Sequence, residues 1–229
     1  MTDVKLVDMT EFPRPILTVD VVLLTLSDGE ILIGSIERQD APFAGARALP
    51  GGYVHVDEDE DTLATVLRVV RQKIGVSDVL CEQLATYSGV TRDPRGWSAT
   101  VGYYGVIPKQ ISVSPERSSH FSWLKEDELS GLAFDHGKIA SDALTRVRNK
   151  SNYSTLPAYF LPDVFTLAEL RQTYETVLGT KLNDSAFRRK IEELDILYRH
   201  EGQMSKRTAR PAQMFSLKHD TLHAFDRRI

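Results

Sequence analysis

Cysteine is almost absent from this chain of 229 residues, since Cys81 is the only one. A single cysteine excludes an intrachain disulfide and argues against a Cys/His metal site, and it fits the reducing cytoplasm. Long apolar runs are absent as well, because no stretch approaches the roughly 18–20 residues that span a membrane. The first residues also lack the basic-then-apolar order of a signal peptide. We therefore expect a cytoplasmic protein without a membrane partner.

Basic residues are not in excess either, because 28 Lys and Arg stand against 32 Asp and Glu, a net charge of −4. That average hides an asymmetry. Residues 151–229 carry 12 Lys/Arg and 10 Asp/Glu, and within 181–210 the balance is 8 to 5. Nucleic-acid contacts require locally concentrated basic residues, so the C-terminal part is the region in which to look for them.

The first 150 residues alternate between strand and helix patterns. Two segments rich in leucine and β-branched residues, 16–26 and 31–36, flank the turn-forming residues 27–29 and predict a hairpin. A helix is predicted where apolar residues recur at helical spacing, with Gly75 as its cap: Leu63, Val66, Val70 and Ile74. Three more strands are expected at 80–88, 97–107 and 121–124, and a helix at 138–148. Interleaved strands and helices indicate an α/β sandwich.

The character of the chain changes at residues 149–162, where a polar stretch gives way to Leu-Pro pairs with few charges. We therefore divide the chain into a domain of residues 1–152 and a smaller domain of residues 153–229. The smaller domain begins a helix with the capping box of residues 166–169 and ends it at Gly179. A short turn leads to a second helix that buries Phe187, Ile191 and Leu194, and strands are expected at 196–198 and 213–217.

A helix, a turn, a second helix and a hairpin with a basic tip form a winged helix-turn-helix pattern. Such a second helix enters the major groove, while the wing holds the DNA backbone. A winged domain that binds another protein is the alternative, with the same residues as a solvated face. The expected DNA contacts are Lys181, Asn183, Ser185, Arg188, Arg189 and Lys190 on the helix-turn-helix, and Lys206, Arg207 and Arg210 on the wing.

Residues 51–76 are the most distinctive stretch of the chain. They resemble the Nudix box, which consists of a glycine, a glutamate six residues later, and then Arg-Glu-apolar-x-Glu-Glu-x-Gly-apolar. Gly52 and Glu58 match the front of this pattern. The back is matched, if two extra residues are allowed between the halves, by Arg68, Val70, Gly75 and Val76.

The three glutamates that hold magnesium in an active box lie on one helix face, because their spacing is i, i+3, i+4. Their positions here are occupied by Val69, Gln72 and Lys73. Valine cannot bind a metal, glutamine is a weak neutral ligand, and lysine repels a cation. We therefore expect a fold element without catalytic residues, bound metal or required cofactor. The acidic run 57–61 is interpreted as a solvated loop with acids in the first helical turn, and a cation site is the alternative.

Two further motifs resemble a branch of the Nudix proteins that hydrolyses or senses ADP-ribose. One is residues 92–96, Arg-Asp-Pro-Arg-Gly before an aromatic strand, and the other is residues 132–136, Leu-Ala-Phe-Asp-His before a helix. Two arginines on a rigid turn can grip a pyrophosphate, although arginines exposed on a proline-containing turn give the same pattern. Asp135 and His136 fit a ligand site or an ordinary helix N-cap beside a hydrogen-bonded histidine.

The combination of a degenerate Nudix domain and a winged helix-turn-helix resembles the NrtR family of transcriptional regulators. That resemblance implies a homodimeric bacterial repressor of NAD-biosynthesis genes that binds a palindromic operator and is released by its effector, ADP-ribose. The ligand-binding residues would be Arg38, Arg47, Gly51, Gly52, Arg92 and Arg95. Two alternatives stay open: an active Mg-dependent ADP-ribose or nucleotide pyrophosphatase with an accessory winged domain, and an interaction protein that binds neither ligand nor DNA.

Overall fold

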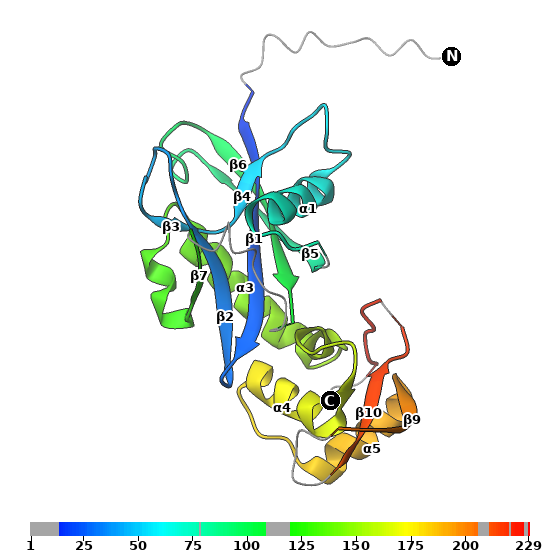
Figure 1. Ribbon diagram of the computed structural model, residues 1–229. Helices are drawn as coiled ribbons and strands as arrows, with labels where there is room; N and C mark the ends of the chain where they lie inside the picture. Colours follow the sequence, from blue (N-terminus) through cyan, green and yellow to red (C-terminus); the bar gives the residue numbers. More distant parts are fainter. Residues whose placement is uncertain (1–13, 78, 109–119, 206–210, 220, 227–228) are drawn as a thin grey trace, which may run out of the picture.

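The computed structural model describes residues 14–77, 79–108, 120–205, 211–219, 221–226 and 229. These residues form a mixed sheet between helices, with a smaller winged-helix unit beyond one end of it (Figure 1). The expected fold class, an α/β sandwich with a mixed sheet followed by a smaller winged domain, is confirmed. No helix in the described ranges is both long and apolar enough to cross a membrane.

The strand β1 (Ile16–Ser27) lies at the centre of the large sheet. It pairs antiparallel with β2 (Glu30–Glu37) and with β4 (Gly51–Tyr53), and parallel with β6 (Ser98–Val106). The sheet is completed by β3 (Arg47–Ala48) and β7 (Phe121–Leu124), which both pair with β2, and by β5 (Leu80–Gly89), which pairs with β6. A parallel pair between β1 and β6 needs a crossover, and the chain makes it through a helix.

Both faces of this sheet are covered, by α1 (Thr62–Lys73) on one side and α3 (His136–Ser151) on the other. Successive side chains of a strand point to opposite faces. Val21 and Leu23 of β1 therefore pack in the cluster with α1, and Val22 and Leu24 in the cluster with α3. This double burial explains why β1 reads as a continuous apolar run rather than an alternating one.

The inward stripe of α1 differs from the expected one at its start. Val66, Val69 and Val70 are buried, whereas Leu63 is 38% exposed because it lies at the edge of the stripe. The acidic run does not form the first helical turn as expected. The helix begins after Asp61, whose carboxylate accepts a hydrogen bond from the N–H of Ala64 at 2.8 Å and so acts as the N-cap.

The winged-helix unit combines two helices with a three-stranded antiparallel sheet. Its elements are β8 (Phe165–Thr166), α4 (Leu167–Leu178), α5 (Asp184–Leu194), β9 (Leu197–Ser205) and β10 (Ala212–Leu217). The expected strand at 196–198 is too short, because β9 continues to Ser205, which pairs with Ala212. Residues 203–205 therefore belong to the strand and not to the wing tip. An exposed wing strand lacks an apolar repeat, so its length cannot be read from hydrophobicity.

The two units are joined through α3 and α4, which pack against each other. Between them, the short 3-10 helix Leu156–Phe160 follows the end of α3. The phenol of Tyr174 in α4 is buried and donates to the backbone oxygen of Ser154 at 2.7 Å. The expected division after residue 152 falls in this connection and stays a prediction.

The capping box at the start of α4 provides a test of local stability. The Thr166 hydroxyl accepts from the N–H of Glu169 at 3.2 Å, and the Glu169 carboxylate accepts from the N–H of Thr166 at 2.7 Å. Thr166→Val keeps the shape but removes the cap, so we expect a loss of about 1 kcal/mol in the free energy of unfolding. Thr176→Val, in the same helix, is the matched control. Equal urea midpoints for the two variants would contradict a stabilising cap.

Candidate functional site

The candidate site is a pocket of about 250 Å³ beside the start of β1. The strands β1, β2 and β4 contribute to its wall, together with the last residue of α1, the turn 92–95 and the start of α3. Five of the six predicted ligand-binding residues line it: Arg38, Gly51, Gly52, Arg92 and Arg95. The fold thus brings together residues that are up to 57 positions apart in the sequence.

Arg47 is the predicted residue that does not line this pocket. It lies in β3, and its guanidinium donates to the hydroxyls of Ser35 and Ser122 on β2 and β7. These bonds tie together three strands at one edge of the sheet. In this structure Arg47 therefore has a structural role, and its assignment to the ligand stays a prediction without geometric support.

Gly51 and Gly52 bring backbone close to β1. In the pairing of β4 with β1, Gly51 lies opposite Asp20 and Gly52 opposite Val19. A Cβ atom on Gly51 would lie 2.1 Å from a carboxylate oxygen of Asp20 and 2.7 Å from the backbone oxygen of Val19. A Cβ on Gly52 would lie 3.0 Å from a methyl group of Val69. Only glycine therefore lets β4 approach both β1 and α1 at this point.

A buried histidine and carboxylate form the floor of the pocket. Nδ1 of His136 accepts a hydrogen bond from the N–H of Leu49 at 2.9 Å, and its Nε2 lies 3.5 Å from a carboxylate oxygen of Asp20. Burial lowers the pKa of His136, while the charge of Asp20 acts in the opposite direction. The ring is neutral, and because Nδ1 accepts, Nε2 carries the proton toward Asp20. His136 thus links the backbone at Leu49 to the carboxylate of Asp20.

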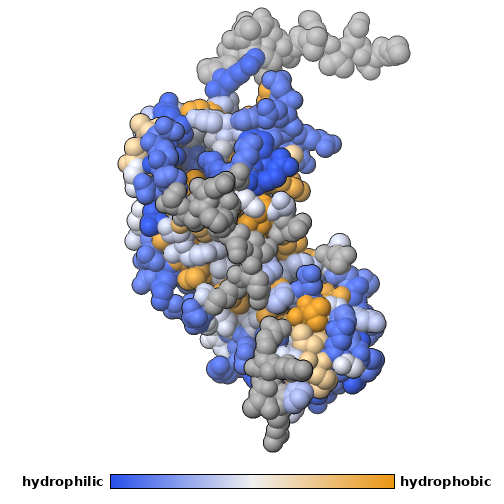
Figure 2. All heavy atoms as spheres, viewed as in Figure 1, coloured by the Kyte–Doolittle hydropathy of each residue, from blue (hydrophilic) through white to orange (hydrophobic). Residues whose placement is uncertain are grey.

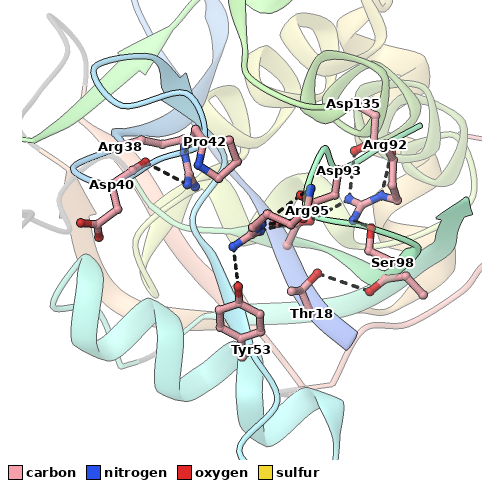
Figure 3. Close-up of polar contacts among 12 residues, drawn as sticks. Thr18, Arg38, Asp40, Pro42, Tyr53, Arg92, Asp93, Arg95, Ser98 and Asp135 are labelled. Carbon is pink, nitrogen blue, oxygen red and sulfur yellow. Dashed lines mark hydrogen bonds and ion pairs between the residues drawn. The ribbon is translucent and has the colours of Figure 1, made fainter. Parts of the chain in front are cut away.

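Arg92 is a buried ion-pair partner rather than an exposed arginine. Its side chain is 8% exposed. Its Nη2 lies 2.9 Å from one carboxylate oxygen of Asp135 and its Nε 3.1 Å from the other, and Nη1 donates to the hydroxyl of Ser98 at 3.2 Å (Figure 3). Asp20 lies 3.5 Å away on the same guanidinium. Asp135 precedes α3 without capping it through its side chain. Its carboxylate is instead the ion-pair partner of Arg92.

Arg95 is more exposed and points across the mouth of the pocket. Its guanidinium contacts the carboxylate of Asp93, with the shortest distance 2.7 Å, and it donates to the phenol of Tyr53 on the opposite wall (Figure 3). The hydrogen bonds from Arg95 are the largest cause of the lowered pKa of Asp93. The two arginines of the 92–96 motif therefore each have an internal carboxylate partner, which the sequence pattern did not reveal.

An aromatic ring that the sequence reasoning missed, Phe134, lies against the arginines. The guanidinium carbon of Arg38 is 4.8 Å from the centre of this ring, and that of Arg95 is 5.9 Å from it. Arg38 also donates to the backbone oxygens of Pro42 and Asp40, at 2.7 and 3.2 Å. Cationic groups stacked on an aromatic face are restrained in position. The signal that could have identified Phe134 was its place inside the 132–136 motif.

Two acids of the run 57–61, Asp59 and Asp61, have partners inside the fold. The carboxylate of Asp59 is almost fully buried and receives both Nε and Nη2 of Arg68, at 2.7 and 2.6 Å. Hydrogen bonding from Arg68 is the main cause of the strongly lowered pKa of Asp59. Asp61 caps α1. The other four acids of the loop are exposed, so the loop is solvated as expected except at Asp59, which is paired with the arginine of the box.

The residues at the box positions do not fit a magnesium site. Val69 is buried and Gln72 and Lys73 replace the other two carboxylates. Among the described residues, no group of three or more His, Cys, Asp or Glu side chains is arranged to hold a metal. Hard cations such as magnesium require carboxylate oxygens, so the chemistry of these side chains disagrees with metal binding here.

The predicted recognition helix is α5. Its N-cap is Asn183, whose side-chain oxygen accepts from the N–H of Ala186 at 3.0 Å, while Phe187 and Ile191 face the core. Ser185, Arg188 and Arg189 are exposed. Figure 2 shows mostly hydrophilic residues along the lower right edge of the molecule, where α5 lies in Figure 1. The helix thus presents polar side chains to solvent on the side away from its core.

Lys181 and Lys190 have different surroundings. Lys181 is exposed, and its ammonium lies 3.1 Å from the carboxylate of Glu175, which also accepts from the N–H of Leu182 at 2.9 Å. Glu175 therefore fixes the turn between the two helices. Lys190 is partly buried on α5. The predicted wing residues lie outside the described part of the chain: Lys206, Arg207 and Arg210.

The close contact between β4 and β1 generates a prediction about the pocket. Gly51→Ala forces a methyl group onto Asp20 and Val19, so we expect the free energy of unfolding to fall by about 1–3 kcal/mol, the usual cost of overpacking. Gly131→Ala is the matched control, because a Cβ there meets no atom within 4 Å. Urea denaturation of the two variants provides the measurement. Equal stability would show that the strands can separate without cost.

Comparison with known proteins supports both halves of this description. A family model described as the NrtR DNA-binding winged helix domain matches residues 157–217. The ADPR responsive transcriptional repressor NtrR of Acinetobacter baylyi is 35% identical over 210 residues, which are 90% of this chain and 83% of that protein.

Two solved structures are similar to this chain, one over nearly its whole length and one over its Nudix-like part. Shewanella oneidensis NrtR complexed with a 27mer DNA has a TM-score of 0.85 and 35% identity, covering 93% of this chain and 99% of that chain. The NUDIX domain of the same NrtR complexed with ADP ribose has a TM-score of 0.54 and 36% identity, covering 61% and 93%. On the identity over almost its whole length, this chain belongs to the NrtR family.

Proposed function

We propose that this protein is an ADP-ribose-responsive transcriptional repressor of NAD-biosynthesis genes that acts in the bacterial cytoplasm. The observation that carries this proposal is the presence, in one chain, of a pocket lined by four Lys and Arg side chains and of a winged helix whose helix α5 exposes Arg188 and Arg189. The Acinetobacter relative responds to ADPR as a repressor, and the Shewanella relative forms complexes with DNA and with ADP ribose. These three properties are the ones that a ligand-controlled repressor combines.

ADP-ribose would bind in the 250 Å³ pocket with its pyrophosphate toward the backbone of Gly51 and Gly52. The guanidinium groups of Arg38 and Arg95 both lie over the ring of Phe134 and would contact the ligand directly. Arg92 would act mainly by holding Asp135 and Asp20 in place, since most of its donors already have internal acceptors. A preorganised set of charges loses little side-chain entropy when the ligand binds.

The same pocket would bind its ligand without cleaving it. Hydrolysis in the Nudix manner needs magnesium to polarise the pyrophosphate and activate water, and the α1 positions that would hold it carry Val69, Gln72 and Lys73. A protein that binds without turnover reports the ligand concentration instead of changing it. This separates the repressor from the pyrophosphatase hypothesis.

Two elements provide a physical connection between the pocket and the DNA-binding unit. β1 carries Asp20 at the pocket and ends in the hairpin whose second strand, β2, contacts α4. α3 begins with His136 at the pocket and packs on α4 at its other end. We propose that ligand binding shifts α4 and α5 through these elements. In a homodimer, the spacing of the two α5 helices must match the half-sites of a palindromic operator, so a small shift reduces affinity.

The first test is binding to promoter DNA from NAD-synthesis genes of the host, titrated with ADP-ribose in the absence of magnesium. We expect the protein to bind and ADP-ribose to release it. Because coupling between sites is reciprocal, operator DNA should weaken ADP-ribose binding by the same factor. Binding that ADP-ribose leaves unchanged would point to another effector. Magnesium-dependent formation of AMP would support the pyrophosphatase instead, and failure to bind either partner would support the interaction protein.

The assignment of α5 is tested by Arg188→Ala. We expect weaker DNA binding. If Arg188 contacts a phosphate, the slope of log affinity against log salt concentration should also be smaller in magnitude by about 0.9. If Arg188 contacts a base instead, the variant should lose roughly 1–3 kcal/mol of discrimination between the preferred base and the others at that position. Binding of ADP-ribose should not change. Arg148→Ala removes the same charge from α3 and is the control. Equal DNA affinity for the two variants would remove Arg188 from the contact surface.

A further inference from the structure

Lys73 is the last residue of α1 and follows the buried residues Val66, Val69 and Val70 at helical spacing, at the exposed end of that helix face. A lysine at this place is unusual, because the stripe otherwise packs against the sheet. The preceding turn orients Val69 toward Gly52, where a Cβ on the glycine would meet a Val69 methyl at 3.0 Å. The buried residues of α1 therefore extend to the pocket, and the helix ends there at Lys73.

The Lys73 ammonium reaches into the pocket. Its Nζ donates to the backbone oxygen of Gly51 at 2.5 Å, and the residue lines the pocket together with Arg38 and Asp20. The residue as a whole is exposed to solvent, and the hydrogen bond to Gly51 holds its ammonium against the pocket wall. Desolvation lowers the pKa of Lys73, and the charge of Asp20 counteracts this shift. The group is thus a cation held at the pocket by its hydrogen bond to Gly51.

The charges of the pocket are only partly balanced. Of its four Lys and Arg side chains, Arg92 is held by Asp135 and Asp20, and Arg95 is held by Asp93. Within the described residues, Arg38 and Lys73 have hydrogen bonds to backbone oxygens and no ion pair with a carboxylate. These two are therefore the cations that an anionic ligand can engage without displacing an internal partner.

We propose that the ammonium of Lys73 takes the place of the divalent cation of Nudix hydrolases and binds the pyrophosphate of the ligand directly. This assignment rests on the proposed function and names what replaces the metal within it. A lysine supplies positive charge and three N–H donors at a fixed position. It cannot bind and activate a water molecule as a metal does. The same substitution therefore preserves affinity for the pyrophosphate and removes its hydrolysis.

The effect of magnesium on ADP-ribose affinity distinguishes a ligand-binding Lys73 from a lysine that only stabilises the fold. A pocket with a built-in cation binds its ligand equally well with and without magnesium. Lys73→Met removes the charge and leaves the stem, so ADP-ribose binding should weaken about ten- to hundredfold, as expected for loss of a charge-assisted hydrogen bond. Lys73→Arg keeps the charge and should stay within a few-fold of the native protein. Lys73→Glu should bind poorly in EDTA and regain affinity when magnesium is added.

The experiment is calorimetric titration of the full chain with ADP-ribose, in EDTA and in magnesium. Lys125→Met is the matched control, because Lys125 is an exposed lysine outside the pocket, paired with Glu30. Thermal unfolding and operator binding without ADP-ribose confirm that each variant is folded, and Lys73→Arg provides a charge-retaining comparison if Lys73→Met is unstable.

The outcomes separate the two proposals. Binding by the native protein in EDTA that is lost in Lys73→Met and kept in Lys73→Arg and Lys125→Met supports the assignment. Native binding that needs magnesium, or that Lys73→Met retains in EDTA, overturns it while leaving ADP-ribose as the ligand. Absence of ADP-ribose binding by the native protein in both buffers overturns the proposed function itself, and this assignment with it.

Discussion

The burial of β1 on both faces is the constraint on which the other features depend. Its residues from Val19 to Leu24 pack alternately with α1 and α3, so the strand cannot move without disturbing both clusters. Its start pairs with the two glycines of β4 at the pocket, and its end leads into the hairpin beside α4. One rigid strand thus extends from the ligand pocket toward the DNA-binding unit.

The pocket combines internal ion pairs with a helix end that lacks the glutamates of the Nudix box. Its arginines and carboxylates form internal pairs, Arg92 with Asp135 and Arg95 with Asp93, and these pairs hold the walls. The helix that would present metal-binding glutamates presents a valine that packs on Gly52 and a lysine that reaches Gly51. A hard cation would meet no carboxylate at these three positions of the helix. A pyrophosphate would meet the positive charge of Lys73.

Packing rather than a flexible linker joins sensor and DNA-binding unit. The buried phenol of Tyr174 bonds to the backbone just after α3, and α3 itself begins at the pocket with His136. Packed helices transmit small displacements because interiors are dense and have few voids. Glu175 then fixes the turn before α5 through Leu182 and Lys181. A displacement of α4 would therefore be passed to α5.

The sequence by itself determined the order of elements, the capping box at Thr166 and the loss of the box glutamates, because these depend on local patterns and residue identity. The resemblance to the NrtR family implied six ligand residues, and five of them, all except Arg47, line one pocket. Only the tertiary structure decided which of these charges are already paired, since Asp135 and Asp20 reach Arg92 from distant elements. It likewise separated Arg47 from the pocket and placed Lys73 at it, because the direction of a side chain depends on how its strand or helix packs against the rest of the sheet.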